Sequence, residues 1–441
     1  MRPSKITILG NYWDCQIYRG RLYLTCMDGS MKTIDWNKLV DSLCEDGNSS
    51  IAIIYAFQNG RNLYHPGLHE LFADKDIKNL LASKFELLAS REIVFEELQL
   101  NDFIIGQQES PFNELQVDSD IFSNRMYILT YNSLLSSSVH SKTKYPVSTK
   151  TTKHFDLYAI SMRANKYARI VLSAGNDGLL EYNASTTEFL PMRDDKRMCQ
   201  VSNSHSSFAD YSFLSIYNSS LYGKSFLSYF KWDENQNGIK PQKVQMGEFS
   251  ESKIFNSPNH EIKSFLSWGF NEKIYRAIPG GIEVVRFNNY SKEEGDIFSK
   301  TKFIPLQPWK GEVIAAFTSY FGTVLQCENA VVVMLSDGTF YNIPGSSTKV
   351  RVYPRSLNYE NHLHVILDDR IEIYSFNNDY FIDQKSKDFG VAFKTPKTYG
   401  YVRGGYVSKY ESDQDYYEFN PSKLSNSEGE YSDLDVGDLP F

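Results

Sequence analysis

Two histidines in the C-terminal part of the chain have a spacing that suits metal binding. His362 and His364 are two residues apart, so on a β-strand their side chains lie on the same face. With a carboxylate such as Asp368 or Asp369 they would form a ligand set that zinc accepts. Because no third ligand has a diagnostic spacing, we interpret the pair as ordinary strand histidines. We predict neither a metal ion nor a cofactor.

The segment NSSLYGKS, residues 218–225, ends like a phosphate-binding loop. Gly223, Lys224 and Ser225 match the end of the pattern G-x-x-x-x-G-K-[ST], but Asn218 stands where the first glycine belongs. The alternation of Tyr, Phe and Leu around this segment predicts a strand, which lacks the strand-to-helix turn whose backbone amides cradle phosphate. We therefore interpret Lys224 as a solvated strand lysine.

None of the common enzyme motifs is present in the chain. The sequence contains no H-E-x-x-H, no G-x-S-x-G and no G-x-G-x-x-G, which are patterns of metalloproteases, hydrolases and dinucleotide-binding proteins. The acid pairs Asp194–Asp195 and Glu293–Glu294 lie in charged stretches typical of solvated surface. A site assembled from distant residues would leave no local pattern. We name no catalytic residue and favour a protein without catalytic activity, with an enzyme as the alternative.

The acidic charge of the chain is concentrated at its C-terminal end. Residues 411–441 hold nine acids and one base, Lys423. Subtracting these from the totals of 54 acids and 46 bases leaves 45 of each in residues 1–410. A neutral body argues against broad binding of a phosphate backbone, which needs a basic face. Direct nucleic-acid binding would require Lys142, Lys144, Lys150 and Lys153 to converge with aromatic side chains.

The compartment and the tail follow from composition. Five cysteines without a C-x-x-C indicate reduced, mostly buried thiols, and no stretch approaches the roughly 18 apolar residues of a membrane helix. We therefore expect a soluble cytoplasmic protein with no membrane partner. Residues 411–441 are too rich in Ser, Asn, Asp, Glu and Gly to bury a core, and we expect them to be disordered.

A repeated pattern of hairpins predicts an all-β body. In each repeat a hydrophobic run meets a Gly or Asp turn and is followed by an alternating run that ends in an aromatic residue. The five repeats span residues 22–36, 169–182, 273–287, 331–343 and 364–376. Weaker strand-rich blocks cover residues 51–57, 93–99, 125–135, 211–232 and 312–327.

Three other segments complete the expected organisation. Residues 68–90 have apolar residues near helical spacing, which predicts a helical insertion. Residues 136–152 and 233–260 are polar and read as exposed loops. Residues 391–410 supply the last strands, which close the body against the N-terminal strands. Closure of a ring removes exposed sheet edges.

In blade rhythm and D-G turns, residues 1–410 resemble WD40-like β-propellers. The spacing of the first turns is close to multiples of roughly 50 residues, near the usual length of a propeller blade, and seven blades fit better than six or eight. The Gly-His and Trp-Asp signatures of that family are missing. The resemblance implies a rigid interaction platform that works through its top face or its central channel.

The end of the chain resembles the C-terminal peptide of bacterial single-stranded-DNA-binding proteins, in which clustered acids precede an apolar residue, proline and phenylalanine. In that family the Phe ring enters an apolar pocket of a replication or repair enzyme and the acids are steered by positive charge. The same residues also resemble the peptides that load enzymes into encapsulin shells. The residues that we expect to bind a partner are Asp433, Asp435, Asp438, Leu439, Pro440 and Phe441.

These patterns together predict a non-catalytic protein-interaction scaffold. Its C-terminal acidic peptide would recruit a partner, for which the resemblance implies bacterial DNA repair, replication or phage defence. One alternative is a propeller hydrolase or lyase with its site at the channel mouth. Another is that the tail serves as an autoinhibitory or shell-loading peptide.

Overall fold

The computed structural model describes residues 2–389 apart from short gaps, the longest of which are 64–73, 140–145, 184–196, 202–207, 234–241, 288–296 and 382–388, and it does not describe residues 390–441. In the described part of the chain the strands form seven sheets. Six of these contain four strands that pair antiparallel in chain order. We name each sheet by its innermost strand.

The first sheet in chain order contains β2 (Tyr12–Tyr18), β3 (Arg21–Cys26), β4 (Ser30–Asp35) and β6 (Ile104–Glu109). The second contains β7 (Gln116–Phe122), β8 (Arg125–Thr130), β9 (Ser133–Val139) and β10 (Val147–Asp156). The third contains β11 (Ser161–Ala164), β12 (Arg169–Ser173), β13 (Leu179–Asn183) and β14 (Arg197–Val201). The fourth sheet contains β15 (Phe208–Ser212), β16 (Ser215–Ser219), β17 (Phe226–Asp233) and β18 (Gln242–Ser250). The fifth contains β19 (Leu266–Phe270), β20 (Lys273–Ile278), β21 (Gly281–Arg286) and β22 (Lys302–Ile304). The sixth contains β23 (Val313–Ser319), β24 (Gly322–Cys327), β25 (Ala330–Leu335) and β26 (Phe340–Pro344).

The seventh sheet joins the two ends of the described chain. Its strands are β27 (Lys349–Val352), β28 (His362–Ile366), β29 (Arg370–Ser375), β1 (Ser4–Leu9) and β5 (Ile93–Phe95). β1 pairs antiparallel with β29, so the N-terminal strand completes a sheet that the C-terminal strands begin.

The innermost strands contact one another in a closed circle. β2 contacts β7, and the contacts continue through β11, β15, β19 and β23 to β27, which contacts β2 again. Apolar clusters fill the space between neighbouring sheets, for example between the β19 and β23 sheets and between the β23 and β27 sheets. A closed ring of four-stranded sheets is a β-propeller. The all-β propeller expected from the sequence is confirmed.

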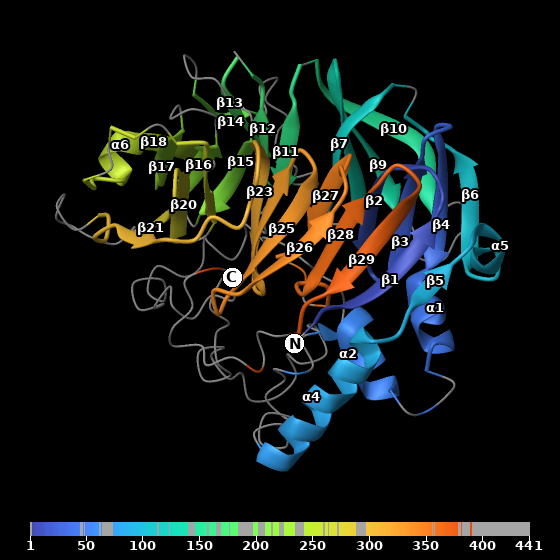
Figure 1. The fold of residues 1–441 in the computed structure, drawn as a ribbon. Coiled ribbons are helices and arrows are strands. Elements are labelled where there is room, and N and C mark those ends of the chain that lie inside the picture. The colour runs from blue at the N-terminus through green and yellow to red at the C-terminus, as the bar shows by residue number, and fades with distance from the viewer. Residues whose placement is uncertain are drawn as a thin grey trace, which may run out of the picture.

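Antiparallel pairing gives the ring two distinguishable faces. In every sheet the innermost strand begins on the face where the second strand ends and the third begins. We call this face the top face. The opposite, bottom face carries the helices that follow β4, which Figure 1 shows gathered near the N-terminus, with one helix extending away from the sheets.

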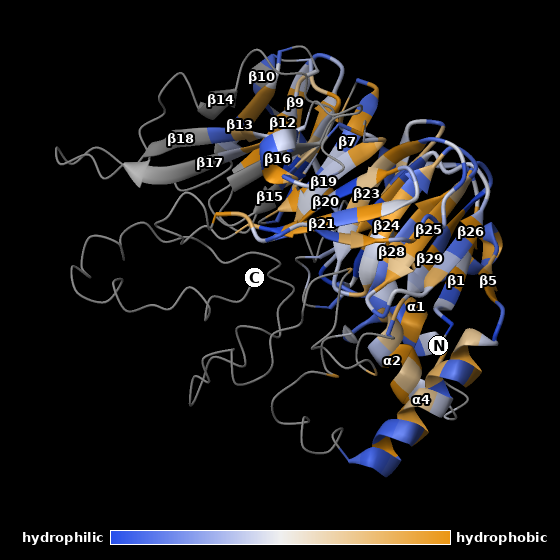
Figure 2. Cartoon of the chain, turned by 60° about the vertical axis from the view of Figure 1, so that its left-hand side comes forward, coloured by the Kyte–Doolittle hydropathy of each residue, from blue (hydrophilic) through white to orange (hydrophobic). Residues whose placement is uncertain are grey.

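The helices belong mainly to one insertion between β4 and β6. The insertion contains α1 (Trp36–Ser42), α2 (Ser50–Phe57), α4 (Lys75–Ala89), strand β5 and α5 (Glu97–Leu100). Asp74 caps α4, because its carboxylate accepts hydrogen bonds from the backbone amides of Asp76 and Ile77. Apolar and polar residues alternate in stripes along α4 (Figure 2). The helical insertion expected at 68–90 is confirmed for the residues that form α4.

All five predicted hairpins are present. They are β3–β4, β12–β13, β20–β21, β25–β26 and β28–β29. Four of their turns contain a glycine with positive φ, among them Gly29 at 83°, Gly178 at 86°, Gly280 at 85° and Gly338 at 84°. Side chains other than glycine rarely adopt this backbone conformation, which explains why the Gly turns were readable in the sequence.

Four expectations about single segments were wrong in whole or in part. Residues 51–57, expected to be a strand, belong to α2, because an unbroken apolar run fits a helix buried on most sides as well as a strand. Of residues 93–99, only the first three form a strand, and α5 begins at Glu97. Much of 233–260 is regular structure, formed by the end of β17, by β18 and by α6 (Glu251–Ile254), and 136–152 contains parts of β9 and β10. Polar outer strands explain both misread loops, since solvent-facing strands lack apolar alternation.

Closure of the ring was expected to involve residues 391–410, which lie outside the described residues. The structure closes the ring between β29 and β1 instead. In the described part of the chain no helix is long and apolar enough to span a membrane. Cys15, Cys26 and Cys327 are buried free thiols, and Cys44 is partly buried and free.

Candidate functional site: the top face and the polar cluster beneath it

A buried arginine joins three sheets close to their innermost ends. The guanidinium of Arg351 on β27 donates to Asp14 on β2, with Nε 2.9 Å from Oδ1 and Nη2 2.6 Å from Oδ2. Its third nitrogen, Nη1, lies 2.7 Å from Oδ1 of Asp118 on β7. The cluster therefore links the β27 sheet, which joins the two ends of the chain, to the β2 and β7 sheets.

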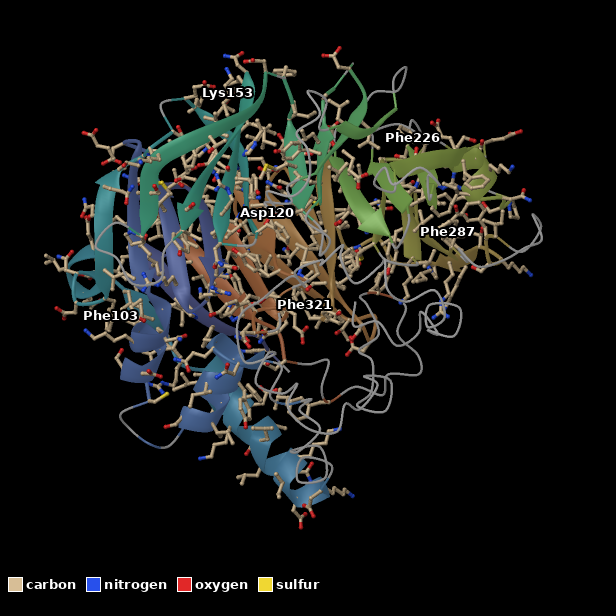
Figure 3. All side chains as sticks on the ribbon, turned by 180° about the vertical axis from the view of Figure 1, so that it is seen from behind. Phe103, Asp120, Lys153, Phe226, Phe287 and Phe321 are labelled. Carbon is tan, nitrogen blue, oxygen red and sulfur yellow. The ribbon has the colours of Figure 1, made fainter. Side chains whose placement is uncertain are left out.

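The carboxylates of β7 also occupy the edge of the next innermost strand. Asp118 Oδ2 accepts the backbone N–H of Met162 at 2.9 Å, and Asp120 Oδ2 accepts that of Ala164 at 3.0 Å. Both amides belong to β11, whose inner edge faces the middle of the ring. Figure 3 shows Asp120 near the middle of the molecule. Paired in this way, the innermost edge has fewer free donors for another chain to bind.

Two cations lie beside these acids. Lys349 Nζ donates to the Val117 carbonyl at 2.8 Å and lies 5.6 Å from the centre of the half-buried Trp13 ring. The guanidinium of Arg163 on β11 lies 5.1 Å from the centre of the Phe317 ring on β23. β11 and β23 are not neighbours in the ring, so this contact crosses its middle. Side chains therefore reach across the channel at that level.

The charges of the cluster hold each other ionised. Burial alone would raise the pKa of Asp14, but the positive charges of Arg351 and Lys349 and hydrogen bonds outweigh burial and lower that pKa to about 2. The pKa of Asp118 is lowered for similar reasons, by Arg351 and Arg163 against the effect of burial. Burial lowers the pKa of Lys349, although the neighbouring acids oppose the shift.

This arrangement suits structure better than acid–base catalysis. A general acid or base works best when its pKa lies near the working pH, whereas Asp14 and Asp118 are strongly acidic and both carboxylates are engaged by Arg351. Acids drawn from several sheets would favour an enzyme if they faced an open channel. Here Asp14, Asp118 and Arg351 are buried. The cluster acts as a brace between sheets.

His362 and His364 form a directional hydrogen-bond chain rather than a metal site. His362 Nε2 is 2.9 Å from the carbonyl of Ala56 on α2, which can only accept, so Nε2 carries the hydrogen. His362 Nδ1 must then accept from His364 Nε2 at 3.4 Å, and His364 Nδ1 faces the Tyr353 hydroxyl at 3.1 Å and the Cys15 thiol at 3.4 Å.

Burial keeps both histidines neutral. It lowers the pKa of His362 to about 4, although the bond to Ala56 opposes the shift, and it lowers the pKa of His364 well below the usual value. Among the described residues no group of three or more His, Cys, Asp or Glu side chains could hold a metal ion. Asp368 and Asp369 follow β28 in the turn toward β29 and do not complete a site.

Several exposed apolar side chains lie on the top face. Tyr131, in the turn between β8 and β9, and Tyr158, before β11, are 49% and 50% exposed and stack with ring centres 6.4 Å apart and planes 15° apart. Leu115, just before β7, is 59% exposed. Its neighbour Glu114 accepts a hydrogen bond from Thr130 at 2.5 Å, which holds these two segments together. We call Leu115, Tyr131 and Tyr158 the tyrosine patch.

Further large apolar residues are exposed on the same face. They are Met27 in the β3–β4 turn, Ile262 before β19 and Ile314 at the start of β23. Such side chains, when gathered on one face of a monomer, mark surfaces that bind other proteins. The top face therefore offers apolar anchors above a rigid, cross-braced ring.

The site residues predicted from sequence have different outcomes. Asp433, Asp435, Asp438, Leu439, Pro440 and Phe441 lie outside the described residues, as do Lys142, Lys144 and Lys224. Lys150 and Lys153 are exposed on β10, and Lys153 pairs with Asp156 at 2.5 Å. Figure 3 shows Lys153 at the outer rim, away from Asp120.

Sequence reasoning missed both the brace and the tyrosine patch. A signal for the brace was present, because Lys349 and Arg351 are charges at alternating positions of an otherwise apolar strand start. Their partners Asp14 and Asp118 are far away in sequence, so no spacing could have joined them. The patch had no sequence signal, since an exposed tyrosine and a buried one look alike.

No protein-family model matches the chain, and no curated protein matches it. Among solved structures it is similar to the WD40 domain of Neurospora crassa Pan2, with 10% identity and a TM-score of 0.39 over 83% of this chain and 89% of that one. It is also similar to Kluyveromyces lactis Hsv2 (13% identity, TM-score 0.37, 63% and 78% of the two chains) and to human WBSCR16 (8% identity, TM-score 0.37, 62% and 90%). At these values the fold assignment rests on the strand pairing and the ring of contacts.

Proposed function

We propose that this protein is a non-catalytic binding platform that holds a protein partner on its top face, at the tyrosine patch. The observation that carries the proposal is the exposed, stacked pair Tyr131 and Tyr158 beside Leu115. Tyrosine is enriched among the residues that dominate binding energy at protein interfaces, because its ring buries a large area with few rotatable bonds.

The turn that carries Tyr131 is held in place before any partner binds. The hydroxyl of Thr130 accepts the backbone N–H of Ser133 at 3.0 Å and lies 3.0 Å from its side-chain oxygen. Both hydroxyls also contact the Glu114 carboxylate. A rigid turn reduces the ordering cost of binding, which favours affinity.

Replacing both tyrosines with glutamate tests the platform. Full-length protein is used to capture partners from cells, the partners are purified, and their Kd values for wild type and for the double variant Y131E/Y158E are measured by calorimetry. We expect at least a 30-fold weaker Kd, since loss of one interface hot spot costs about 2 kcal/mol or more. Phe340→Glu is the matched control, because Phe340 is 53% exposed but lies at the bottom of an outermost strand. Equal Kd values for the double variant and wild type would refute the proposal.

We propose further that the acidic C-terminal segment is a second docking element, bound by a DNA repair or replication protein or by a phage-defence partner. The support is the sequence, in which Asp433, Asp435 and Asp438 precede Leu439, Pro440 and Phe441. A phenylalanine anchor with neighbouring acids suits an apolar pocket rimmed by basic residues.

Full-length Phe441→Ala tests the docking element, and Phe419→Ala is its control because that phenylalanine lies in the same acidic segment. We expect Phe441→Ala alone to lose the DNA-processing partner. We also expect association of the wild type to slow as salt is raised, because the acids would steer the encounter. If both variants bind the partner equally well, the ending has no docking role, and the tyrosine patch is unaffected by that result.

A further inference from the structure

The insertion between β4 and β6 returns to the ring and pairs with the strand that closes it. β5 lies parallel to β1, with Ile93 opposite Ile6 and Phe95 opposite Ile8. The other edge of β1 pairs with β29 over six residues, from Ser4 to Leu9. The closing strand is therefore an interior strand with partners on both sides, and its edge is covered by the insertion.

We call the pairing of β1 with β29 the seam of the ring. The insertion is attached to β1 on one side of the seam and also to the β28–β29 hairpin on the other side. The carbonyl of Ala56, near the end of α2, accepts hydrogen bonds from His362 Nε2 at 2.9 Å and from Asn361 Nδ2 at 3.0 Å. Gly60 lies two residues beyond Gln58, the C-cap of α2. Its backbone N–H donates to the carbonyl of Asn358 at 3.2 Å. The partners of Ala56 and Gly60, which are His362, Asn361 and Asn358, belong to β28 and to the loop before it. The insertion thus contacts β1 directly and the β28–β29 hairpin through α2.

One hydrophobic core contains both sides of the seam and the insertion. From the strands it includes Ile6 and Ile8 of β1 and Ile371 and Ile373 of β29. The insertion residues of the same core are Trp36, Leu39, Val40, Ala52, Ile53, Tyr55, Ala56, Phe57, Leu63, Leu81, Phe85, Leu88, Ile93, Phe95 and Leu100. Because a packed core transmits displacement between its members, the insertion cannot move away without exposing the seam.

We propose that the insertion is a strap that controls opening of the seam between β1 and β29. While the insertion is docked, the ring stays closed. Displacement of the insertion from the loop before β28 releases β5 and lets β1 separate from β29.

A single methyl group at position 60 is a selective way to loosen the strap. A Cβ added at Gly60 would lie 2.5 Å from Oδ1 of Asn361. Asn361 is buried and holds Ala56, Ser375 and Asn377 through its Nδ2, so its side chain cannot simply rotate away. Gly60→Ala should therefore push α2 away from the β28 loop.

Hydrogen exchange followed by mass spectrometry on the full chain measures the consequence. For Gly60→Ala we expect exchange in residues 4–9 and 370–375 to become about tenfold faster or more, while residues 313–335, on the neighbouring β23 sheet, stay as in wild type. Gly269→Ala is the matched control, because its Cβ would meet the Tyr217 side chain at 2.9 Å in a distant part of the ring. It should leave the seam unchanged.

Two results would overturn the strap. One is faster exchange in α2 with an unchanged seam, which would show that the insertion moves independently. The other is equally faster exchange in every sheet, which would show general loss of stability. If Gly60→Ala does not fold, native-state hydrogen exchange of the wild type in rising denaturant tests the strap instead. The strap requires β1 and α2 to open in one cooperative step. Opening of β1 and α2 in separate steps would refute it.

Discussion

Arg351 is the residue on which the central brace depends. Its guanidinium satisfies Asp14 and Asp118, and the side chains of all three are at most 10% exposed. A buried ion pair contributes little in comparison with well-packed apolar residues, but removal of one partner leaves an uncompensated buried charge. Single substitutions within the brace should therefore be far more harmful than their surface counterparts.

We expect Arg351→Met to lower the free energy of unfolding by about 3–5 kcal/mol, measured by urea denaturation at pH 7. Lys5→Met is the control, because Lys5 pairs with Glu372 at 3.2 Å but is 40% exposed, and loss of such a pair costs less than about 1 kcal/mol. Similar losses for the two variants would contradict the brace.

The acid dependence of stability gives the same prediction a second readout. The pKa of Asp14 is lowered from 3.8 to about 2 in the folded protein, so its contribution is complete above pH 3.8 and is lost as pH falls toward 2. Without Arg351 the largest part of that contribution is absent, and Lys349 and the hydrogen bond from Ser119 remain. The stability gap between Arg351→Met and wild type should therefore narrow as pH falls through this window.

At this scale the sequence was informative only about local chemistry. The spacing of His362 and His364 placed both side chains on one face of a strand, which is where β28 carries them. The brace could not be predicted, because Asp14 and Arg351 lie at opposite ends of the chain and meet only once the ring is closed. Burial of a charge, which distinguishes the brace from a surface pair, is a property of the fold and not of the residue type.

At the scale of elements, the bond between α2 and β28 couples a helix to a sheet through a neutral histidine. His362 donates to Ala56 and can do so with a single proton on its ring. A second proton would fall on Nδ1, which accepts from His364. Protonation therefore breaks the chain at the junction between the two histidines.

We expect stability to fall as pH is lowered from 6.5 toward 4. The pKa of His362 is lowered to about 4 in the folded protein, so between these values the unfolded chain binds more protons and folding is disfavoured, by up to roughly 3 kcal/mol. His362→Gln keeps an amide donor for Ala56 without a titrating ring. Thermal unfolding of this variant should depend less on pH in this window, and an unchanged dependence would exclude His362 as the cause.

Elements with turn chemistry were predictable and buried apolar runs were not. The D-G turns at Asp28–Gly29 and Asp337–Gly338 announced hairpins because only glycine readily adopts the positive φ that they contain. Residues 51–57 carry no such punctuation. Their helical state follows from packing between α4 and the core, which lies outside any local window.

At the scale of the whole molecule, the repeated hairpins made the propeller predictable. The strands that close the ring were not predictable. Hairpins recur along the chain, so a ring of sheets was foreseeable from residues alone. The pairing of residues 4–9 with 370–375 has no local pattern, and for that reason closure was assigned to the wrong segment. The parallel strand β5 was equally invisible, since three residues carry too little periodicity to define a strand.

Closure by the two ends of the chain has a consequence during synthesis on the ribosome. β29 follows β1 by about 360 residues, so at 5–20 residues per second β1 waits on the order of 20–70 s for that partner. β5 follows β1 by only about 85 residues and emerges within about 20 s at the same rates. The insertion can therefore shelter the nascent β1 strand from aggregation for most of the time that translation of the remaining sheets requires.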